Sequence, residues 1–332
     1  MARRTHSSRS EVSAADKLRD WVGLSRIYLR ARRQVADVSG VEEQAAYLEA
    51  ALERHGHAGL RGARVLEIGF GARPLLLHWM VANGIDATGV DLDAPLVSLS
   101  PRNIARVAAT NGLERAAKSV GRLLIEGGRE RAALEKRLLE VTGRESRLPV
   151  ERLLVADAAS ESFWSGVGPA TLDVVYSLGV LEHVPAASLE GMLKGIRESL
   201  KPGGLAILRP NVFTGITGGH LHEWYPDQVV ATTPKSTDPW EHLRSRRVNA
   251  NTYLNELPRR AYVRLFEQLF DVLEDTAVEP ELGRSYLTDA VRQELAEWDE
   301  YELMSNEVSF VLRPRDAGAH GDGPKSPREA IC

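Results

Sequence analysis

Short apolar runs alternate with helical segments along most of this chain, and this alternation is the feature that most limits its fold. Each run is rich in Val, Leu and Ile and ends near Gly or Asp. Strands separated by helices pair in parallel through crossover connections, which place helices on both faces of the sheet. We therefore predict an α/β fold, with a Rossmann-like, doubly wound, mostly parallel, seven-stranded sheet. The predicted strands are 64–68, 86–90, 153–156, 172–176, 205–208, 272–278 and 308–312.

Segments that do not fit this alternation divide the chain. We predict an N-terminal helical extension over 1–60, one α/β domain over 61–313 and a disordered tail over 314–332. Within the domain, 95–150 is far longer than a usual connection of about 2–6 residues, so we expect inserted helices there. The irregular segment 211–260 is too long for a turn and is expected to act as a lid or a binding loop. Helices are predicted over 13–35, 75–81, 187–200, 261–270 and 287–303.

Composition excludes several classes of protein. Lys and Arg number 42 and Asp and Glu 46, which gives a net charge of −4 and argues against a globally basic nucleic-acid binder. The one cysteine, Cys332, rules out a disulfide within the chain and a zinc site built on cysteines. No apolar run approaches the roughly 18 residues of a membrane span. We therefore expect a cytoplasmic protein that does not enter membranes.

The first predicted strand leads into a turn with two glycines, Gly69 and Gly71, and a helix follows. Glycine lets the backbone approach a ligand closely, and the start of a helix offers free N–H groups. Dinucleotide-binding turns carry a third glycine where this chain has Pro74, so the fit to a pyrophosphate is poor. Glu67 would repel phosphate and attract a cation. These residues favour a cationic ligand such as S-adenosylmethionine, which carries an amino group and a sulfonium.

Polar or small residues follow the next three predicted strands. Asp91 comes about 20 positions after the turn, where a carboxylate can accept from both ribose hydroxyls. Asp157 can accept from an adenine amino group, and the small Ala158 leaves space beside the ring; a helix N-cap is the alternative role for Asp157. Ser177 ends the fourth strand. Because ligands bind beyond the carboxyl ends of parallel strands, we expect Ser177 opposite Gly69 across one crevice.

In this order, the motifs resemble those of class I S-adenosylmethionine-dependent methyltransferases. The resemblance is to the small-molecule branch, in which the fourth motif contains Val-Leu-Glu-His, and it covers about 63–210. The third glycine of the family's turn is Arg73 here, which leaves the detailed turn geometry open. The motifs are Glu67-x-Gly69-x-Gly71, Asp91, Asp157-Ala158, the run from Ser177 to His183, and Leu200-Lys-Pro-Gly-Gly204.

The resemblance implies a cofactor-binding role for each motif. Glu67 and the two turn glycines would border the methionine part of S-adenosylmethionine, and Ser177 would lie near the methionine backbone. Asp91 would hold the ribose. Asp157 and Ala158 would face the adenine.

Three histidines are candidate catalytic bases, which are needed only when the acceptor must lose a proton. His183 follows the fourth strand, near the expected position of the methyl group; its alternative role is structural, at a helix start. His220 and His222 follow the fifth strand, where the connection would border the acceptor pocket. Trp224 and Tyr225 could form the wall of that pocket.

Metal binding is an alternative use of these histidines. His220 and His222 could ligate a metal together with Glu223, but the spacing fixes no third ligand. Some metal-dependent relatives carry a carboxylate three residues before the position of Glu182, and here that position is Gly179. We therefore expect no metal.

The resemblance implies an enzyme that moves a methyl group from S-adenosylmethionine to a small or medium-sized organic acceptor and leaves S-adenosylhomocysteine. We expect O-methylation by in-line displacement, with nitrogen and carbon acceptors as open alternatives. A nucleic-acid or protein methyltransferase is supported only by basic patches at 26–33 and 129–137. A non-catalytic binder and an NAD-dependent dehydrogenase are the remaining alternatives, and Pro74 disfavours the dehydrogenase. The additional helices could cap the crevice or form a homodimer interface.

Overall fold

We describe the protein from a computed structural model. Three sequence predictions lie outside the described residues: the helix over 13–35, the basic patch at 26–33 and the tail beyond 315. The described residues are 38–96, 99–123, 128–231, 233–249 and 252–315.

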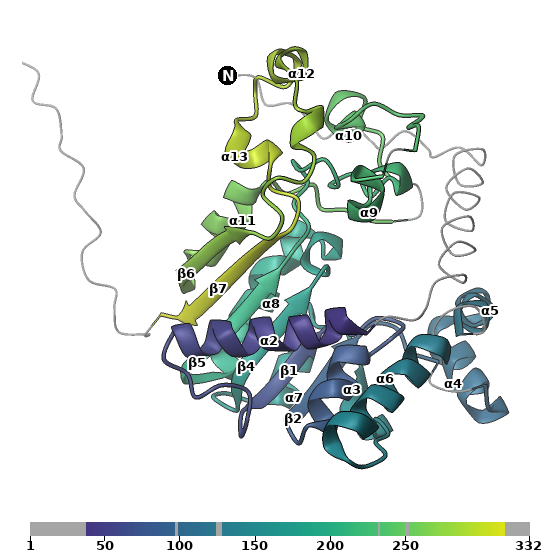
Figure 1. Cartoon of the computed structure of the whole chain (residues 1–332). Helices are drawn as coiled ribbons and strands as arrows, with labels where there is room; N and C mark the ends of the chain where they lie inside the picture. The colour runs from purple at the N-terminus through teal and green to yellow at the C-terminus, as the bar shows by residue number, and fades with distance from the viewer. Residues whose placement is uncertain (1–37, 97–98, 124–127, 232, 250–251, 316–332) are drawn as a thin grey trace, which may run out of the picture.

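A seven-stranded sheet forms the centre of the molecule (Figure 1). Its strands are β1 (Arg64–Ile68), β2 (Asp86–Asp91), β3 (Leu153–Val155), β4 (Leu172–Leu178), β5 (Leu200–Arg209), β6 (Phe270–Ala277) and β7 (Val308–Pro314). The strand order is β3-β2-β1-β4-β5-β7-β6, with β1 to β5 parallel and β7 antiparallel to both of its neighbours. This topology confirms the predicted fold class. The order reverses at β1, which lies between β2 and β4, so ligands are expected beyond the carboxyl ends of these strands.

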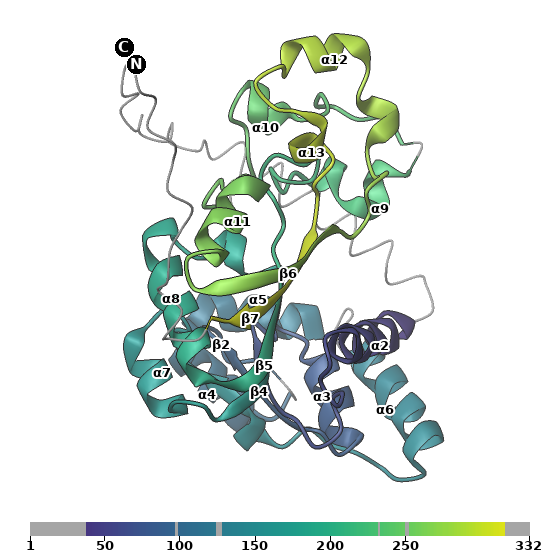
Figure 2. The ribbon, with the colours of Figure 1, turned by 90° about the vertical axis from the view of Figure 1, so that its left-hand side faces the viewer.

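Helices cover both faces of the sheet (Figure 2). The helices on one face are α2 (Ser39–Arg54), α3 (Leu75–Ala82) and α6 (Gly128–Thr142), and those on the other are α7 (Glu161–Val167), α8 (Ala186–Ser199) and α11 (Arg259–Phe266). The apolar residues of α2 recur at helical spacing, with Val41, Ala45, Leu48 and Leu52 all buried. Their burial against the sheet, rather than intrinsic propensity, stabilises this helix.

The segment between β2 and β3 contains α4 (Pro101–Asn111), α5 (Leu113–Arg122), α6 and the short η2 (Val150–Arg152). Helix α4 begins where Ser100 accepts a hydrogen bond from the Asn103 N–H at 3.3 Å, with Pro101 in the first turn. Helices α4 and α5 share a small apolar cluster around Val107. By contrast, Leu134 and Leu138 of α6 join the main core.

The predicted basic patch over 129–137 lies on α6, where acidic residues face its arginines. Arg137 pairs with Glu42 at 2.9 Å, and Arg131 lies 3.8 Å from Glu135. These ion pairs reduce the positive potential that a nucleic-acid surface would need.

Several observed elements differ from the predictions. Helix α11 ends at Phe266 and β6 begins at Phe270, so the helix predicted over 261–270 is too long at its C-terminal end. Strand β5 begins at Leu200 instead of at residue 205, because Leu200 pairs with Leu172 of β4. The helix predicted over 287–303 is wrong, because two N-caps divide it. Thr288 accepts from the Val291 N–H at 3.4 Å and Asp299 accepts from the Glu302 N–H at 3.1 Å. The resulting elements are α12 (Asp289–Glu294) and α13 (Glu300–Leu303), preceded by η5 (Arg284–Tyr286).

Beyond the carboxyl end of β5, short helices gather in what we call the accessory lobe, the described part of 211–258 and 279–306 (Figure 1). It contains η4 (His222–Trp224), α9 (Pro226–Val229), α10 (Glu241–Arg244), η5, α12 and α13. It has a hydrophobic core of its own, in which Trp224 and Trp240 are buried. No helix among the described residues has the length and apolar character that crossing a bilayer requires.

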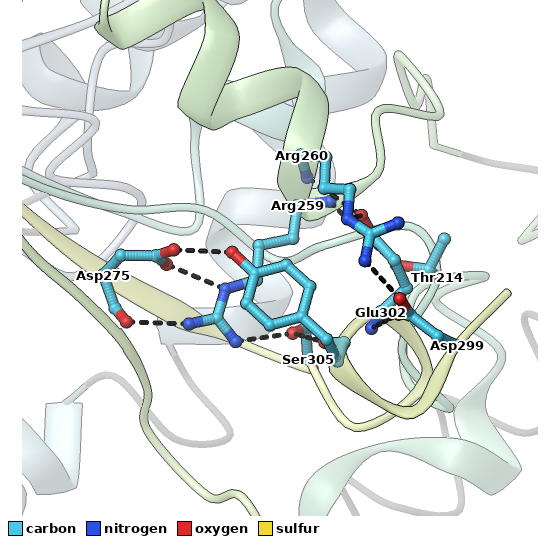
Figure 3. A network of polar contacts seen from close by, with 8 residues as sticks. Thr214, Arg259, Arg260, Asp275, Asp299, Glu302 and Ser305 are labelled. Atoms are coloured by element: carbon cyan, nitrogen blue, oxygen red, sulfur yellow. Dashed lines mark hydrogen bonds and ion pairs between the residues drawn. The ribbon is translucent and has the colours of Figure 1, made fainter.

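The Glu302 carboxylate joins the accessory lobe to the main domain (Figure 3). It is 1% exposed and accepts from the Thr214 hydroxyl at 2.8 Å. It also accepts from the N–H groups of Arg259 at 2.8 Å and Arg260 at 3.0 Å, at the start of α11. A carboxylate at a helix N-terminus satisfies free N–H groups and opposes the helix dipole. Glu302 therefore fixes the loop after β5 relative to α11.

Replacing Glu302 by alanine should lower the free energy of unfolding by about 3 kcal/mol, because three buried donors lose their acceptor. Urea unfolding followed by tryptophan fluorescence measures the change. Glu300→Ala is the matched control on the same helix, because its ion pairs with Arg284 and Arg292 are exposed. Equal unfolding midpoints for the two variants would contradict this role of Glu302.

Candidate functional site

The turn between β1 and α3 holds both predicted glycines in left-handed backbone conformations. Gly69 has a φ of 81° and Gly71 a φ of 66°. A Cβ placed on Gly69 would lie 2.1 Å from Cγ2 of Val180, so the turn contacts the segment that follows β4. A Cβ on Gly71 would meet nothing within 4 Å. The turn is therefore closely packed on one side and open on the other.

Asp91 ends β2 and faces this turn. Its Oδ2 accepts from the Gly71 N–H at 2.8 Å and its Oδ1 from the Asp93 N–H at 2.9 Å. Burial raises the pKa of Asp91, and backbone hydrogen bonds from Asp93, Gly71 and Leu92 oppose that rise. A carboxylate offers about four acceptor positions, so Asp91 can accept further hydrogen bonds from hydroxyl groups.

Glu67 lies on β1 beside Tyr176 of β4 and is 8% exposed. Its Oε2 has no hydrogen-bond partner among the described residues. Burial, followed by the nearby charge of Asp91, raises the pKa of Glu67 to about 8. The Tyr176 hydroxyl is another buried group without a partner in the described part of the chain. A buried carboxylate in this state favours a cation or a hydrogen-bond donor.

The remaining predicted cofactor residues lie at the same edge of the sheet. Ser177 is fully buried and pairs in register with Ile68, which places it beside the end of β1. Asp157 is exposed and accepts from the Ala159 N–H at 2.8 Å, so it closes a turn rather than capping α7. The Ala158 carbonyl accepts from the Trp164 indole at 2.8 Å.

Glu182, His183 and His220 form a second cluster close to the glycine turn. One ligand atom from each lies within 4.8 Å of the others. Glu182 and His183 belong to η3 (Leu181–His183), just after Val180, which contacts Gly69. The rings of His183 and His220 meet edge to face at 5.2 Å between centroids.

Hydrogen bonds from the chain after β5 hold this cluster in place. Asn211 donates to Glu182 Oε1 at 2.8 Å. Nδ1 of His183 lies 2.9 Å from the carbonyl oxygen of Tyr253. Because a carbonyl oxygen can only accept, Nδ1 must carry the proton and donate it, which leaves Nε2 of the neutral ring as the acceptor. Asn255 donates to the carbonyls of Leu181 at 2.7 Å and Val184 at 3.1 Å.

Burial controls the charge of the cluster. Burial, followed by the neighbouring His183 and His242, lowers the pKa of His220 to about 4, so this imidazole is neutral at physiological pH. Burial raises the pKa of Glu182, whose Oε2 has no partner among the described residues. His220 also adopts a left-handed φ of 51°, which is strained for a residue with a side chain.

The other acceptor-pocket candidates are separate from this cluster. Trp224 is 2% exposed and packs in the core of the accessory lobe, where it donates to Thr237 Oγ1 at 2.9 Å. His222 contacts the ring of Tyr225. Glu223 accepts from the N–H groups of residues 236 and 237, so the metal set of two histidines and Glu223 is not assembled.

The sequence reasoning missed Asn211 and Tyr176. Asn211 lies 29 residues from the carboxylate that it holds, and its sequence neighbourhood gives no signal of this contact. Tyr176 could have been noticed as a hydroxyl within an apolar strand.

Residues 41–269 match a family model described as a methyltransferase domain. No curated protein matches the chain. Three solved structures resemble this chain at low sequence identity.

The 1,6-didemethyltoxoflavin N1-methyltransferase of Burkholderia thailandensis is 14% identical, with a TM-score of 0.42, over 93% of this chain and 93% of that one. Geranyl diphosphate C-methyltransferase of Streptomyces coelicolor is 13% identical, with a TM-score of 0.40, over 82% of this chain and 78% of that one. An S-adenosylmethionine-dependent methyltransferase of Archaeoglobus fulgidus is 13% identical, with a TM-score of 0.39, over 84% of this chain and 100% of that one.

Proposed function

We propose that this chain, which belongs to the methyltransferase-domain family and takes S-adenosylmethionine as its cofactor, methylates a small or medium-sized organic acceptor at oxygen. The observation that carries the proposal is the group of polar residues at the end of β1, where Glu67 lies buried beside the glycine turn and close to Asp91. The small-molecule branch and a cytoplasmic location remain predictions from the sequence.

The residues present suit this cofactor. The unpartnered Glu67 Oε2 is a buried acceptor that a cationic ligand would satisfy. The open side of Gly71 leaves room for a ligand, and Asp91 retains acceptor capacity for a ribose. We assign the methionine part to Glu67, Gly69, Gly71 and Ser177, the ribose to Asp91, and the adenine to Asp157 and Ala158.

When bound, the cofactor supplies an electrophilic methyl carbon attached to a positively charged sulfur, and that sulfur is the leaving group, which becomes the neutral thioether of S-adenosylhomocysteine. The chain's own residues align the acceptor and exclude water. An acceptor hydroxyl forms one C–O bond as one C–S bond breaks, and its proton must be taken up. We assign proton uptake to the cluster of Glu182, His183 and His220, whose imidazoles can accept a proton.

Substrate choice is assigned to the accessory lobe. Its segment 211–258 supplies His220, the Tyr253 carbonyl and Asn255 to the cluster, which supports a position of the lobe on the proposed acceptor side. This arrangement supports a cap over a small acceptor. Mass spectrometry of the methylated product identifies whether oxygen, nitrogen or carbon receives the group.

Asp91→Ala should weaken S-adenosylhomocysteine binding by about 1–3 kcal/mol, because two buried ribose hydroxyls would lose their acceptor. Calorimetric titration measures the affinity. Asp93→Ala is the matched control, because it removes a carboxylate that lies two residues after Asp91, beyond the end of β2. Unchanged affinity in Asp91→Ala would refute the ribose assignment, and absence of binding in the folded wild-type protein would refute the proposed function.

A further inference from the structure

The cluster of Glu182, His183 and His220 has a donor set that a metal ion would complete. We propose that these three side chains bind one divalent transition-metal ion, which in turn holds the acceptor oxygen for methylation. This inference rests on the function proposed above, because it names the acceptor-activating device of the same site. From the sequence we expected no metal, since Gly179 stands where some metal-dependent relatives have a carboxylate.

The geometry of the cluster suits a shared ion. The three ligand atoms come from two separate segments and lie within 4.8 Å of one another. Bonds of about 2.0–2.2 Å to one ion place its ligand atoms roughly 3–4.4 Å apart. Small side-chain rotations are therefore enough to gather this set around an ion.

Two of the three ligands are already oriented by a second group, as is usual at metal sites. The Tyr253 carbonyl holds Nδ1 of His183 and directs Nε2 away from it. The Asn211 amide holds Oε1 of Glu182 and leaves Oε2 without a partner among the described residues. His220 is buried and neutral, which is the form of imidazole that binds metals.

Glu182 provides an independent reason to expect a cation. Its side chain is 3% exposed, and an ionised carboxylate so deeply buried is costly unless a positive charge or a donor compensates it. Within the described residues, the basic side chain that approaches it is His183, at 3.8 Å. A bound dication would supply the missing charge.

The donor set also limits the type of ion and its use. Two imidazole nitrogens and one carboxylate oxygen favour Zn²⁺, Fe²⁺, Co²⁺ or Mn²⁺ over Mg²⁺ and Ca²⁺, which prefer oxygen ligands. Three protein ligands leave coordination positions open, and the side chain of His183 is 37% exposed. An acceptor hydroxyl bound at an open position would have a lower pKa. In the metal-bound site, His183 and His220 would serve as ligands instead of as the proton acceptors assigned above, and the proton of the acceptor hydroxyl would pass to water.

Tag-free protein treated with a chelator and dialysed is titrated with Zn²⁺ by calorimetry, and with Co²⁺ by visible absorption. We expect one tight site per chain in the wild type. His220→Ala and Glu182→Gln should each weaken Zn²⁺ binding by at least about 100-fold, since each removes a direct ligand. Mg²⁺ in millimolar excess should not displace the bound Zn²⁺.

His222→Ala is the matched control, because His222 lies two positions from His220 and faces Tyr225 instead of the cluster. This variant should keep the wild-type Zn²⁺ affinity. Asn211→Ala serves as a second test, because it removes no ligand: it should weaken Zn²⁺ about 10-fold. Thermal unfolding and S-adenosylhomocysteine binding verify that each variant is folded.

Zn²⁺ binding that is equally tight in the wild type, His220→Ala and Glu182→Gln would overturn the site, and so would absence of any Zn²⁺ uptake by the wild type. The proposed function is tested separately by S-adenosylhomocysteine. Protein that binds S-adenosylhomocysteine but no Zn²⁺ overturns the metal site alone. Protein that binds Zn²⁺ as expected but no S-adenosylhomocysteine overturns the proposed function and leaves the ion-binding cluster in place.

Discussion

Replacing Glu67 by glutamine is expected to stabilise the free protein at pH 9 and to weaken its binding of S-adenosylmethionine. The pKa of Glu67 is about 8 in the folded protein, against an ordinary value of 4.5. Between these two pH values the unfolded chain releases the proton and the folded chain keeps it. The free energy of unfolding of the wild type therefore falls with rising pH over this interval and levels off above about pH 8.

Glutamine has no carboxyl proton to release, so the free energy of unfolding of the variant does not fall over this pH interval. Its advantage over the wild type should be small at pH 4.5, grow up to about pH 8 and reach several kcal/mol. Urea unfolding at pH 5, 7 and 9 measures the difference. Glu53→Gln, an exposed carboxylate on α2, is the control and should show no such trend. A stability difference that does not change with pH would contradict the buried, protonated state of Glu67.

The binding half of this prediction follows from the same group. A cationic ligand favours ionised Glu67, so binding of S-adenosylmethionine at pH 7 should release up to one proton. Calorimetry in two buffers of different ionisation enthalpy counts the protons. The wild type should release protons and Glu67→Gln should release fewer, with weaker binding. Equal proton release by the two proteins would remove Glu67 from the cofactor site.

Gly69→Ala is expected to destabilise the protein by about 2–4 kcal/mol and to abolish cofactor binding at micromolar concentrations. The φ of 81° costs a residue with a Cβ roughly 1–2 kcal/mol. The new Cβ would also lie 2.1 Å from Cγ2 of Val180, and relieving that overlap must move the turn or the segment before Glu182. Thermal unfolding and titration with S-adenosylhomocysteine measure the two effects.

Gly71 provides the comparison that separates these causes. Its φ of 66° carries similar strain, but a Cβ there would meet nothing within 4 Å. Gly71→Ala should therefore lose less stability than Gly69→Ala. The double variant Gly69→Ala with Val180→Ala should recover part of the loss, because the overlapping methyl groups are removed. Equal losses at both glycines, with no recovery in the double variant, would show that packing against Val180 is unimportant.

The positions of the proposed cofactor residues could be predicted because each lies at or near the carboxyl end of a strand. Parallel pairing brings the carboxyl ends of these strands, with Glu67, Asp91, Asp157 and Ser177, to one edge of the sheet. A periodicity visible in the sequence therefore implies their proximity in space. What periodicity did not provide was the state of Glu67, because its burial depends on Tyr176 and on helices from elsewhere in the chain.

The sequence by itself determined the fold class and the approximate positions of the strands, because the alternation of strands and helices is a local pattern. It also predicted which residues share the edge of the sheet to which we assign the cofactor. The tertiary structure alone decided the burial of Trp224 in the accessory lobe and the meeting of His220 with Glu182. These depend on how a long irregular connection folds back over the sheet. No repeating pattern specifies that path, since it is fixed by many side-chain contacts between residues far apart in the chain.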